Sequence, residues 1–197
     1  MITTIIFDFA GVLTKETLLV GFVKKLQQKF DFDEDLFVKR FHDHEYDYML
    51  AKIGPKELWE SLCAGTEIPY DAFKDAFLNS YEFNPDMIEL VKKLKQKYRV
   101  FVLTDNYDII AGKLKADSEF MGLFEKVFFS NEIKLVKTSP EAFQYLLDQI
   151  GEQPENCIFT DDKEKNLTPA VSLGIKTIHF EGIESFTERL RSLGAQV

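Results

Sequence analysis

Cysteine, histidine and tryptophan are scarce in this chain of 197 residues, which contains two cysteines, three histidines and one tryptophan. Cys63 and Cys157 lie far apart and form no C-x-x-C pair, which argues against a disulfide framework and against a dithiol redox site. We therefore expect two reduced, mostly buried thiols, as is typical of a cytoplasmic protein.

Positively charged residues are also fewer than negatively charged ones. The chain has 24 Lys and Arg residues against 33 Asp and Glu residues, which gives a formal net charge of −9. A nucleic-acid partner is not expected, because the phosphates of nucleic acid attract a positively charged surface. A small anionic substrate stays compatible with this charge, because one metal ion and one lysine reverse the sign locally.

Long apolar runs are absent as well. No stretch of about 18 consecutive apolar residues occurs, so no membrane span is expected. The run Met1–Asp8 lacks both the basic region and the long apolar region of a signal peptide. The composition, with 45% apolar residues, 29% charged residues and 19 phenylalanines, predicts a globular protein with a large aromatic core.

Five short apolar runs, rich in β-branched residues, predict buried strands. They are Ile2–Phe7, Val100–Leu103, Val127–Phe129, Cys157–Thr160 and Lys176–His179. Amphipathic helical patterns separate the later runs, at Pro85–Lys97, Pro140–Ile150 and Leu167–Leu173. Strands that alternate with helices indicate an α/β fold, a doubly wound Rossmann-like parallel sheet with helices on both faces.

The segment Thr17–Phe83 has no convincing strand run. Its four helical patterns cover Leu18–Phe30, Asp35–His44, Pro55–Cys63 and Tyr70–Tyr81. We therefore expect a small helical insert at residues 16–83, placed after the first strand, and a core made of residues 1–15 and 84–197. Nothing in the sequence indicates an oligomeric state.

Polar side chains follow four of the predicted strands. Asp8 follows the first, Thr104, Asp105 and Asn106 the second, Lys137 the third, and Asp161 and Asp162 the fourth. The carboxyl ends of parallel strands meet at one edge of a sheet, where active sites of such folds lie. Three carboxylates would repel one another unless a cation sat between them, and hard oxygen ligands select Mg²⁺. A lysine and a hydroxyl can hold a phosphate, so this set of residues favours phosphoryl transfer.

These motifs resemble those of the haloacid dehalogenase superfamily. The matching runs are F-D-F-A-G-V-L-T at Phe7–Thr14, V-L-T-D-N at Val102–Asn106, V-K-T-S-P-E-A-F at Val136–Phe143 and F-T-D-D-K-E-K-N-L at Phe159–Leu167. The predicted helical insert lies where that superfamily places a helical cap. Among its members, the sequence is most similar to the phosphatase domain of soluble epoxide hydrolases and to bacterial glucose-1-phosphate phosphatases.

The resemblance implies a Mg²⁺-dependent phosphatase of a small phosphorylated metabolite. Asp8 would attack phosphorus and form an aspartyl-phosphate. Mg²⁺ would be held by the Asp8 carboxylate, the main-chain carbonyl of Ala10 and Asp161, with Asp162 or Asn166 acting through water molecules.

The resemblance also implies where the phosphate binds. Thr104 and Lys137 would bind it, next to Asp105. Close relatives more often have Asn at the position of Asp105, so this carboxylate suits the phosphate pocket only if it points away from the phosphate.

Ala10 is a departure from the family pattern. Most phosphatases of the superfamily have a second Asp at this position as general acid and base, and alanine cannot transfer a proton. The glucose-1-phosphate phosphatases also lack this Asp. One alternative is therefore a non-catalytic or weakly active relative. Another is a phosphonatase-like hydrolase, for which Lys52 and Lys56 would be the candidate Schiff-base lysines.

Two further features weigh on these alternatives. Dehalogenation is disfavoured, because it needs no Mg²⁺ site and Asp161 and Asp162 would build one. His42 and His44 lie two positions apart on a predicted helix and so do not share a face. We expect them to face solvent or the edge of a substrate and not to bind a metal.

Overall fold

A parallel sheet of five strands forms the centre of the protein in the computed structural model, which describes residues 1–197. The strands are β1 (Thr4–Phe7), β2 (Arg99–Thr104), β3 (Lys126–Phe129), β4 (Cys157–Asp161) and β5 (Lys176–His179). Their order in the sheet is β3-β2-β1-β4-β5, and every neighbouring pair is parallel. The expected doubly wound Rossmann-like sheet is therefore confirmed, with all five predicted strands present.

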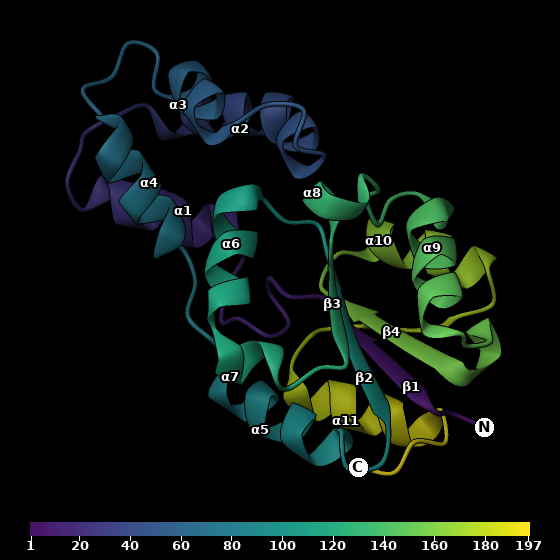
Figure 1. The fold of residues 1–197 in the computed structure, drawn as a ribbon. Coiled ribbons are helices and arrows are strands. Elements are labelled where there is room, and N and C mark those ends of the chain that lie inside the picture. Colours follow the sequence, from purple (N-terminus) through teal and green to yellow (C-terminus); the bar gives the residue numbers. More distant parts are fainter.

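Helices cover both faces of the sheet, because side chains of successive strand residues point to opposite faces. In β1, Ile5 and Phe7 belong to one apolar cluster and Ile6 to another. The first cluster includes residues of α5 (Pro85–Leu94), α6 (Asp108–Ala116), α7 (Ser118–Met121) and α11 (Ile183–Ser192). The second includes residues of α9 (Pro140–Ile150) and α10 (Glu164–Ser172). Figure 1 shows these two groups of helices on opposite sides of the strands.

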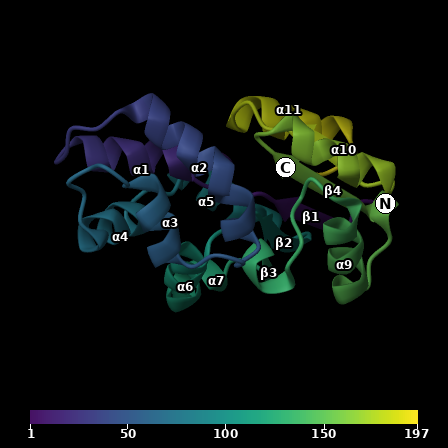
Figure 2. The same ribbon diagram turned by 90° about the horizontal axis from the view of Figure 1, so that it is seen from above.

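The four helices that the sequence predicts within Thr17–Phe83 are present, and their buried side chains belong to the same apolar cluster as those of α5, α6, α7 and α11. The four helices are α1 (Leu18–Gln27), α2 (Glu34–Met49), α3 (Pro55–Leu62) and α4 (Tyr70–Leu78). Phe22 joins α1 to α4, since its ring packs edge-on against Phe73 and Phe77 with centroids 5.1 and 4.7 Å apart. Viewed from above, this four-helix segment lies beside the sheet (Figure 2).

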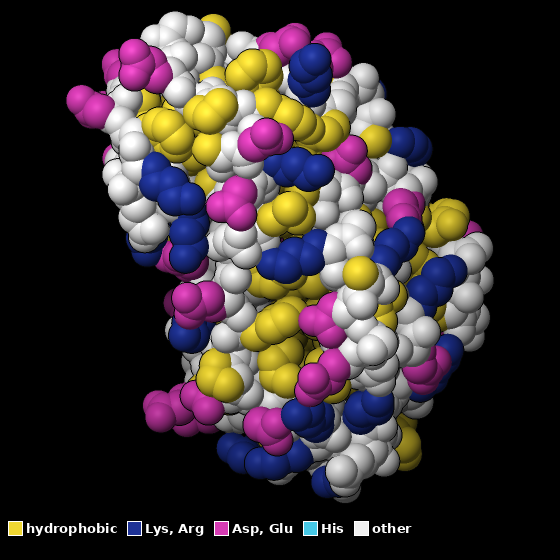
Figure 3. Space-filling view, turned by 60° about the vertical axis from the view of Figure 1, so that its left-hand side comes forward, with side chains coloured by type: hydrophobic (Ala, Val, Ile, Leu, Met, Phe, Trp, Pro, Cys, Tyr) yellow, Lys and Arg dark blue, Asp and Glu magenta, His cyan; other side chains and the backbone are white.

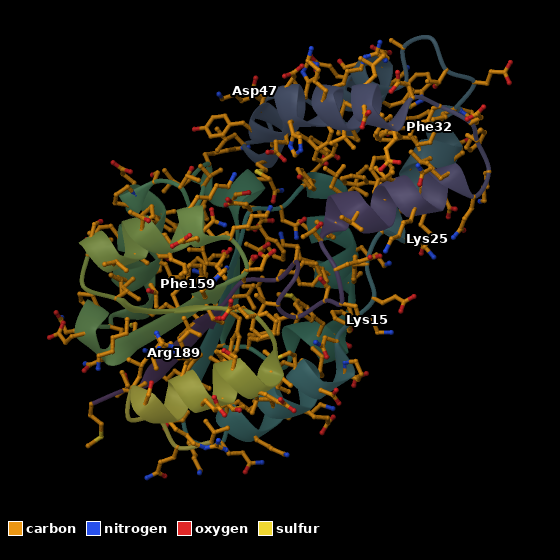
Figure 4. The ribbon with its side chains drawn as sticks, turned by 180° about the vertical axis from the view of Figure 1, so that it is seen from behind. Lys15, Lys25, Phe32, Asp47, Phe159 and Arg189 are labelled. Carbon is orange, nitrogen blue, oxygen red and sulfur yellow. The ribbon has the colours of Figure 1, made fainter.

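The two connections to the four-helix segment run side by side. Thr14 and Phe83 form an antiparallel bridge, and the Lys15 N–H donates to the Glu82 carbonyl at 3.0 Å. Lys15 lies where the chain passes from the sheet to the helices (Figure 4). The chain therefore leaves the core and returns to it at one place.

Several element boundaries differ from the predicted ones. The helix α2 continues to Met49 and not only to His44, because its last turn packs on the core, where the Tyr48 and Tyr107 rings stack with centroids 4.8 Å apart. The helix α10 begins at Glu164, three residues before the predicted start, since its first turn is polar and carries no apolar signal. The short helix α8 (Ser130–Ile133), α6, α7 and α11 have no counterpart among the predicted helices.

Two expectations from composition can be compared with the structure. Cys63 and Cys157 are free and buried, as expected. None of the helices combines the length and the apolar character needed to cross a membrane. On the face shown in Figure 3, basic side chains are interspersed with acidic ones and do not gather into one patch.

Candidate active site

The carboxyl ends of β1, β2 and β4 bring the predicted site residues together. Asp8 directly follows β1, Thr104 ends β2 and Asp161 ends β4. All three are buried, with 5%, 1% and 0% of their surface exposed. The Asp8 N–H donates to the Thr160 carbonyl at 2.9 Å, which continues the pairing of β1 with β4 and fixes the backbone beneath the site.

Lys137 connects the two carboxylates. Its Nζ lies 2.7 Å from Asp8 Oδ1 and 2.5 Å from Asp161 Oδ2, and its side chain is 2% exposed. Burial opposes a charged lysine, but Asp161, Asp8 and Asp105 together raise the pKa of Lys137 above its usual value. The lysine therefore stays protonated and supplies a fixed positive charge inside the site.

Asp161 is the most constrained of the carboxylates. Its Oδ1 accepts a hydrogen bond from the Lys163 N–H at 2.8 Å. The Nδ2 of Asn166, in the first turn of α10, donates to both of its oxygens at 3.0 and 3.1 Å. The loop after β4 and the start of α10 thus hold Asp161 in one orientation.

Asp8, Asp161 and Asp162 form a cluster of carboxylates. One oxygen from each lies within 4.8 Å of the others. Burial raises the pKa of Asp8 to about 8, with Lys137 opposing the shift and Asp161 adding to it. Burial and the charge of Asp161 also raise the pKa of Asp162. One lysine therefore does not balance three carboxylates, and a divalent cation would complete the charge balance.

Buried polar atoms without a hydrogen-bond partner point to the same conclusion. Such atoms are rare in folded proteins and call for a ligand, an ion or a water. Four of them belong to residues of the strand ends and of α10: Thr104 Oγ1, Asn106 Nδ2, Asp162 Oδ1 and Asn166 Oδ1. The oxygens of Asp162 and Asn166 fit the hard ligand set that Mg²⁺ prefers. The hydroxyl of Thr104 and the amide of Asn106 can donate to an anion.

Gly11 makes room for one of these carboxylates. Its φ is +82°, a left-handed conformation that glycine adopts easily. A Cβ at this position would lie 2.7 Å from Oδ2 of Asp162. The loop after β1 can therefore pass beneath Asp162 only as glycine.

Asp105 has a contact that the sequence did not reveal. Both of its oxygens accept from the backbone N–H of Lys137, at 3.0 and 3.3 Å. Burial raises the pKa of Asp105, while Lys137 opposes this shift. The carboxylate thus ties the end of β2 to the loop that carries the lysine.

A cavity of about 280 Å³ opens beside Asp8 and Lys137, whereas Thr104, Asp161 and Asp162 are not among its lining residues. From the core it is lined by Asp8, Ala10, Asp105, Lys137 and Asn166, and from the four-helix segment by residues of α1 and α2. Neither Lys52 nor Lys56 lines it, and Lys52 pairs with Asp47 at 2.9 Å. The structure therefore gives no support to a Schiff-base lysine from this segment.

Several cavity residues were not singled out from the sequence as site residues. They are Glu45, Tyr46 and Met49 of α2, Tyr107 before α6, and Lys163 and Lys165 near the start of α10. The i, i+3, i+4, i+7 spacing of His42, Glu45, Tyr46 and Met49 was the available signal, because such positions share one helix face.

The sheet order and this strand-end cluster match a known family. The chain belongs to the haloacid dehalogenase-like hydrolase family, whose model matches residues 2–174.

Two similar proteins are named for the reactions that they catalyse. A D-ribitol-5-phosphate phosphatase of Bacteroides thetaiotaomicron is 24% identical over 202 residues, which cover 96% of this chain and 97% of that protein. Flavin mononucleotide hydrolase 1 of Arabidopsis thaliana is 26% identical over 137 residues, 68% of this chain and 54% of the relative. The chain thus spans only about half the length of the plant enzyme.

Solved structures share the fold over nearly the full chain. A haloacid dehalogenase family enzyme of Bacteroides thetaiotaomicron has a TM-score of 0.76 and 25% identity, with 96% of this chain and 98% of that chain covered. A complex of a family enzyme from the same organism with magnesium and inorganic phosphate has a TM-score of 0.70 and 25% identity, covering 90% and 93%. Magnesium and phosphate are therefore ligands within this family.

Proposed function

We propose that this protein is a Mg²⁺-dependent phosphatase that hydrolyses a small phosphorylated metabolite through an aspartyl-phosphate at Asp8. The observation that carries the proposal is the buried arrangement of Asp8, Lys137 and Asp161. A carboxylate next to a fixed ammonium group and a further carboxylate suits a nucleophile that works beside a bound cation.

The residues of the cluster divide into metal ligands and groups that control the nucleophile. Mg²⁺ would be held by Asp8, Asp161 and the main-chain carbonyl of Ala10, with Asp162 reached through water, and would supply charge that screens Asp8 from the phosphate. Lys137 orients the Asp8 carboxylate through its 2.7 Å contact and adds positive charge next to the phosphate.

Residues at the end of β2 and after β3 would bind the phosphate. The unpartnered Thr104 Oγ1 and Asn106 Nδ2 would donate to phosphate oxygens, with Lys137 as the charged partner. Asp105 acts on the phosphate indirectly. Its carboxylate accepts a hydrogen bond from the backbone N–H of Lys137 and so holds in place the loop that carries the lysine. Asp105 would then lie beside the phosphate pocket, with its negative charge directed at the backbone of Lys137 and not at the phosphate.

The reaction has two chemical steps at Asp8. Its carboxylate attacks phosphorus, the bond to the leaving oxygen breaks, and an acyl phosphate remains on the protein. Water then attacks the same phosphorus, which releases inorganic phosphate and regenerates Asp8.

The four-helix segment, residues 16–83, would act as the cap over this reaction. Residues of α1 and α2 line the cavity together with Asp8, so they would contact the part of the substrate that is not phosphate. A cavity of about 280 Å³ is at the small end of ligand sites. Its size favours a sugar phosphate or a polyol phosphate, as in the ribitol-phosphate relative, over a flavin nucleotide.

A second candidate is a relative that keeps the fold and binds phosphate without turning it over. The observation in its favour is Ala10, which lines the cavity at the position where the family's acid would lie and cannot transfer a proton.

Phosphate release separates the two candidates. The substrates would be p-nitrophenyl phosphate, ribitol 5-phosphate, glycerol 3-phosphate, glucose 1-phosphate and glucose 6-phosphate, each assayed with Mg²⁺ and with EDTA. We expect Mg²⁺-dependent release from at least one of them. Binding of inorganic phosphate without release from any substrate would support the non-catalytic candidate and overturn the proposed activity.

A further inference from the structure

We propose that His42, oriented by Glu45, is the residue that donates the proton to the leaving group, in place of the acid that Ala10 lacks. The inference rests on the proposed phosphatase function and adds a catalytic residue to it. It also assigns a role to His42, the one of the two histidines of α2 that lines the cavity.

The geometry of α2 brings His42 to the cavity. His42, Glu45, Tyr46 and Met49 follow the spacing i, i+3, i+4, i+7 and all four line the cavity that contains Asp8 and Ala10. These positions share one face of a helix. His44 does not line the cavity and lies off this face.

Contacts at the C-terminal end of α2 fix this face relative to the nucleophile. Ser130 Oγ donates to the Met49 carbonyl at 2.9 Å, and Lys134 Nζ donates to the Leu50 carbonyl at 3.0 Å. Figure 1 shows this end of α2 next to α8, above the edge of the sheet where the site lies. The cavity face is therefore held against the same loops that carry the core residues.

The histidine has a partner that sets its orientation. Nδ1 of His42 lies 3.4 Å from Oε1 of Glu45, one turn further along α2. With Nδ1 turned toward this carboxylate, Nε2 is left for the substrate. The His42 side chain is 55% exposed, so a ligand in the cavity can reach the ring.

The other protonated groups of the cavity suit this role less well. Lys137 is engaged by Asp8 and Asp161, and these carboxylates hold its proton. Asp105 accepts the backbone N–H of Lys137 through both oxygens. Burial raises the pKa of Tyr107 well above its usual value, which makes it a poor proton donor.

The remaining cations are Lys163 and Lys165, which line the cavity from the opposite element. An exposed lysine keeps its proton near neutral pH, whereas histidine exchanges its proton between pH 5 and 8. The charged groups that line the cavity together with His42 are Asp8, Glu45, Asp105, Lys137 and these two lysines.

The two chemical steps balance with His42 as the proton carrier. As Asp8 attacks phosphorus, the phosphorus–oxygen bond of the ester breaks and the leaving oxygen takes the proton from Nε2. The neutral ring then accepts a proton from the water that attacks the acyl phosphate. The alcohol, inorganic phosphate, free Asp8 and the imidazolium result, so no further reactant is needed.

Leaving-group dependence tests the proposal. His42→Gln should lower kcat by about 10²-fold or more on the best alkyl phosphate among ribitol 5-phosphate, glycerol 3-phosphate and glucose 6-phosphate. It should change kcat on p-nitrophenyl phosphate little, because that leaving group departs without a proton. His44→Gln is the matched control and should behave like wild type on both classes.

A second variant separates proton transfer from packing. Ala10→Asp in the His42→Gln background should restore alkyl phosphate turnover by about 10-fold or more, because it returns a carboxyl acid to the family's position. Equal loss on both substrate classes without rescue would overturn the proposal, as would a wild type that hydrolyses only p-nitrophenyl phosphate. No hydrolysis of any substrate by wild type would instead refute the phosphatase function itself.

Discussion

Lys137 and Asp8 form a buried ion pair in which Nζ lies 2.7 Å from Oδ1, although 128 intervening residues separate them in sequence. The same ammonium group also contacts Asp161. Asp8 therefore shares this positive neighbour with a second carboxylate, and the charge of Asp8 depends on what else binds there.

The first prediction concerns stability and pH without a metal. The pKa of Asp8 rises on folding from 3.8 to about 8, chiefly through burial. Between these values the native state keeps a proton that the unfolded chain has lost, so the contribution of Asp8 to stability falls as pH rises through this range. In EDTA, Asp8→Asn should gain thermal stability relative to wild type between about pH 5 and pH 8.

Calorimetric melting temperatures of both proteins across this range provide the measurement. Saturating Mg²⁺ should abolish the relative gain, because the cation stabilises the ionised carboxylate of wild type. Parallel pH profiles of the two proteins in EDTA would contradict the burial effect.

The second prediction concerns covalent catalysis. Asp8→Asn should lower phosphatase turnover by about 10³-fold or more, because an amide is a very poor nucleophile. The substitution is nearly isosteric, so circular dichroism should show an intact fold. Near-normal turnover in this variant would rule out attack by Asp8.

Metal binding leads to the third prediction. Asp161→Ala should weaken Mg²⁺ binding by about 10-fold or more in calorimetric titration, since it removes one carboxylate from the cluster. Asp148→Asn, an exposed position on α9, serves as control and should bind as wild type does. Unchanged affinity in Asp161→Ala would place the ion elsewhere.

Gly11 gives the fourth prediction, together with Gly65 as a matched control. Their φ angles are +82° and +81°, so alanine strains the backbone equally at both, by about 1–2 kcal/mol. Only at Gly11 would the new Cβ meet a carboxylate, 2.7 Å from Asp162 Oδ2, while nothing lies within 4 Å at Gly65. Gly11→Ala should therefore also weaken Mg²⁺ binding and lower turnover, and Gly65→Ala should not. Equal activity in the two variants would show that the position of Asp162 is unimportant.

Much of the fold could be predicted from the sequence, because the strands are buried on both faces and form continuous apolar runs. Where the pattern was weak, prediction failed. The helix α11 is an exception, because its two buried residues, Phe186 and Leu190, lie four positions apart on one helix face and gave a usable signal. The last turn of α2 was missed because Tyr48 is buried against Tyr107, a contact between distant parts of the chain.

The candidate site, too, could be predicted from the sequence only in part. Asp8, Thr104 and Asp161 could be placed together because strand ends meet at one edge of a parallel sheet. The contact between Asp105 and the backbone of Lys137 could not, since it depends on the path of a loop. The position of Glu45 on the cavity was equally hidden, because the spacing along α2 defines a face but not what that face meets.

Because β1 lies between β2 and β4 in the sheet, the site can form only after both of these later strands have been synthesised. β1 takes its neighbours from Arg99–Val102 on one side and Cys157–Thr160 on the other. During synthesis β1 leaves the ribosome before either partner, so one of its edges stays unpaired until β4 has emerged. A nascent chain halted before β4 therefore carries Asp8 without Asp161, and the unpaired edge of β1 is exposed to aggregation.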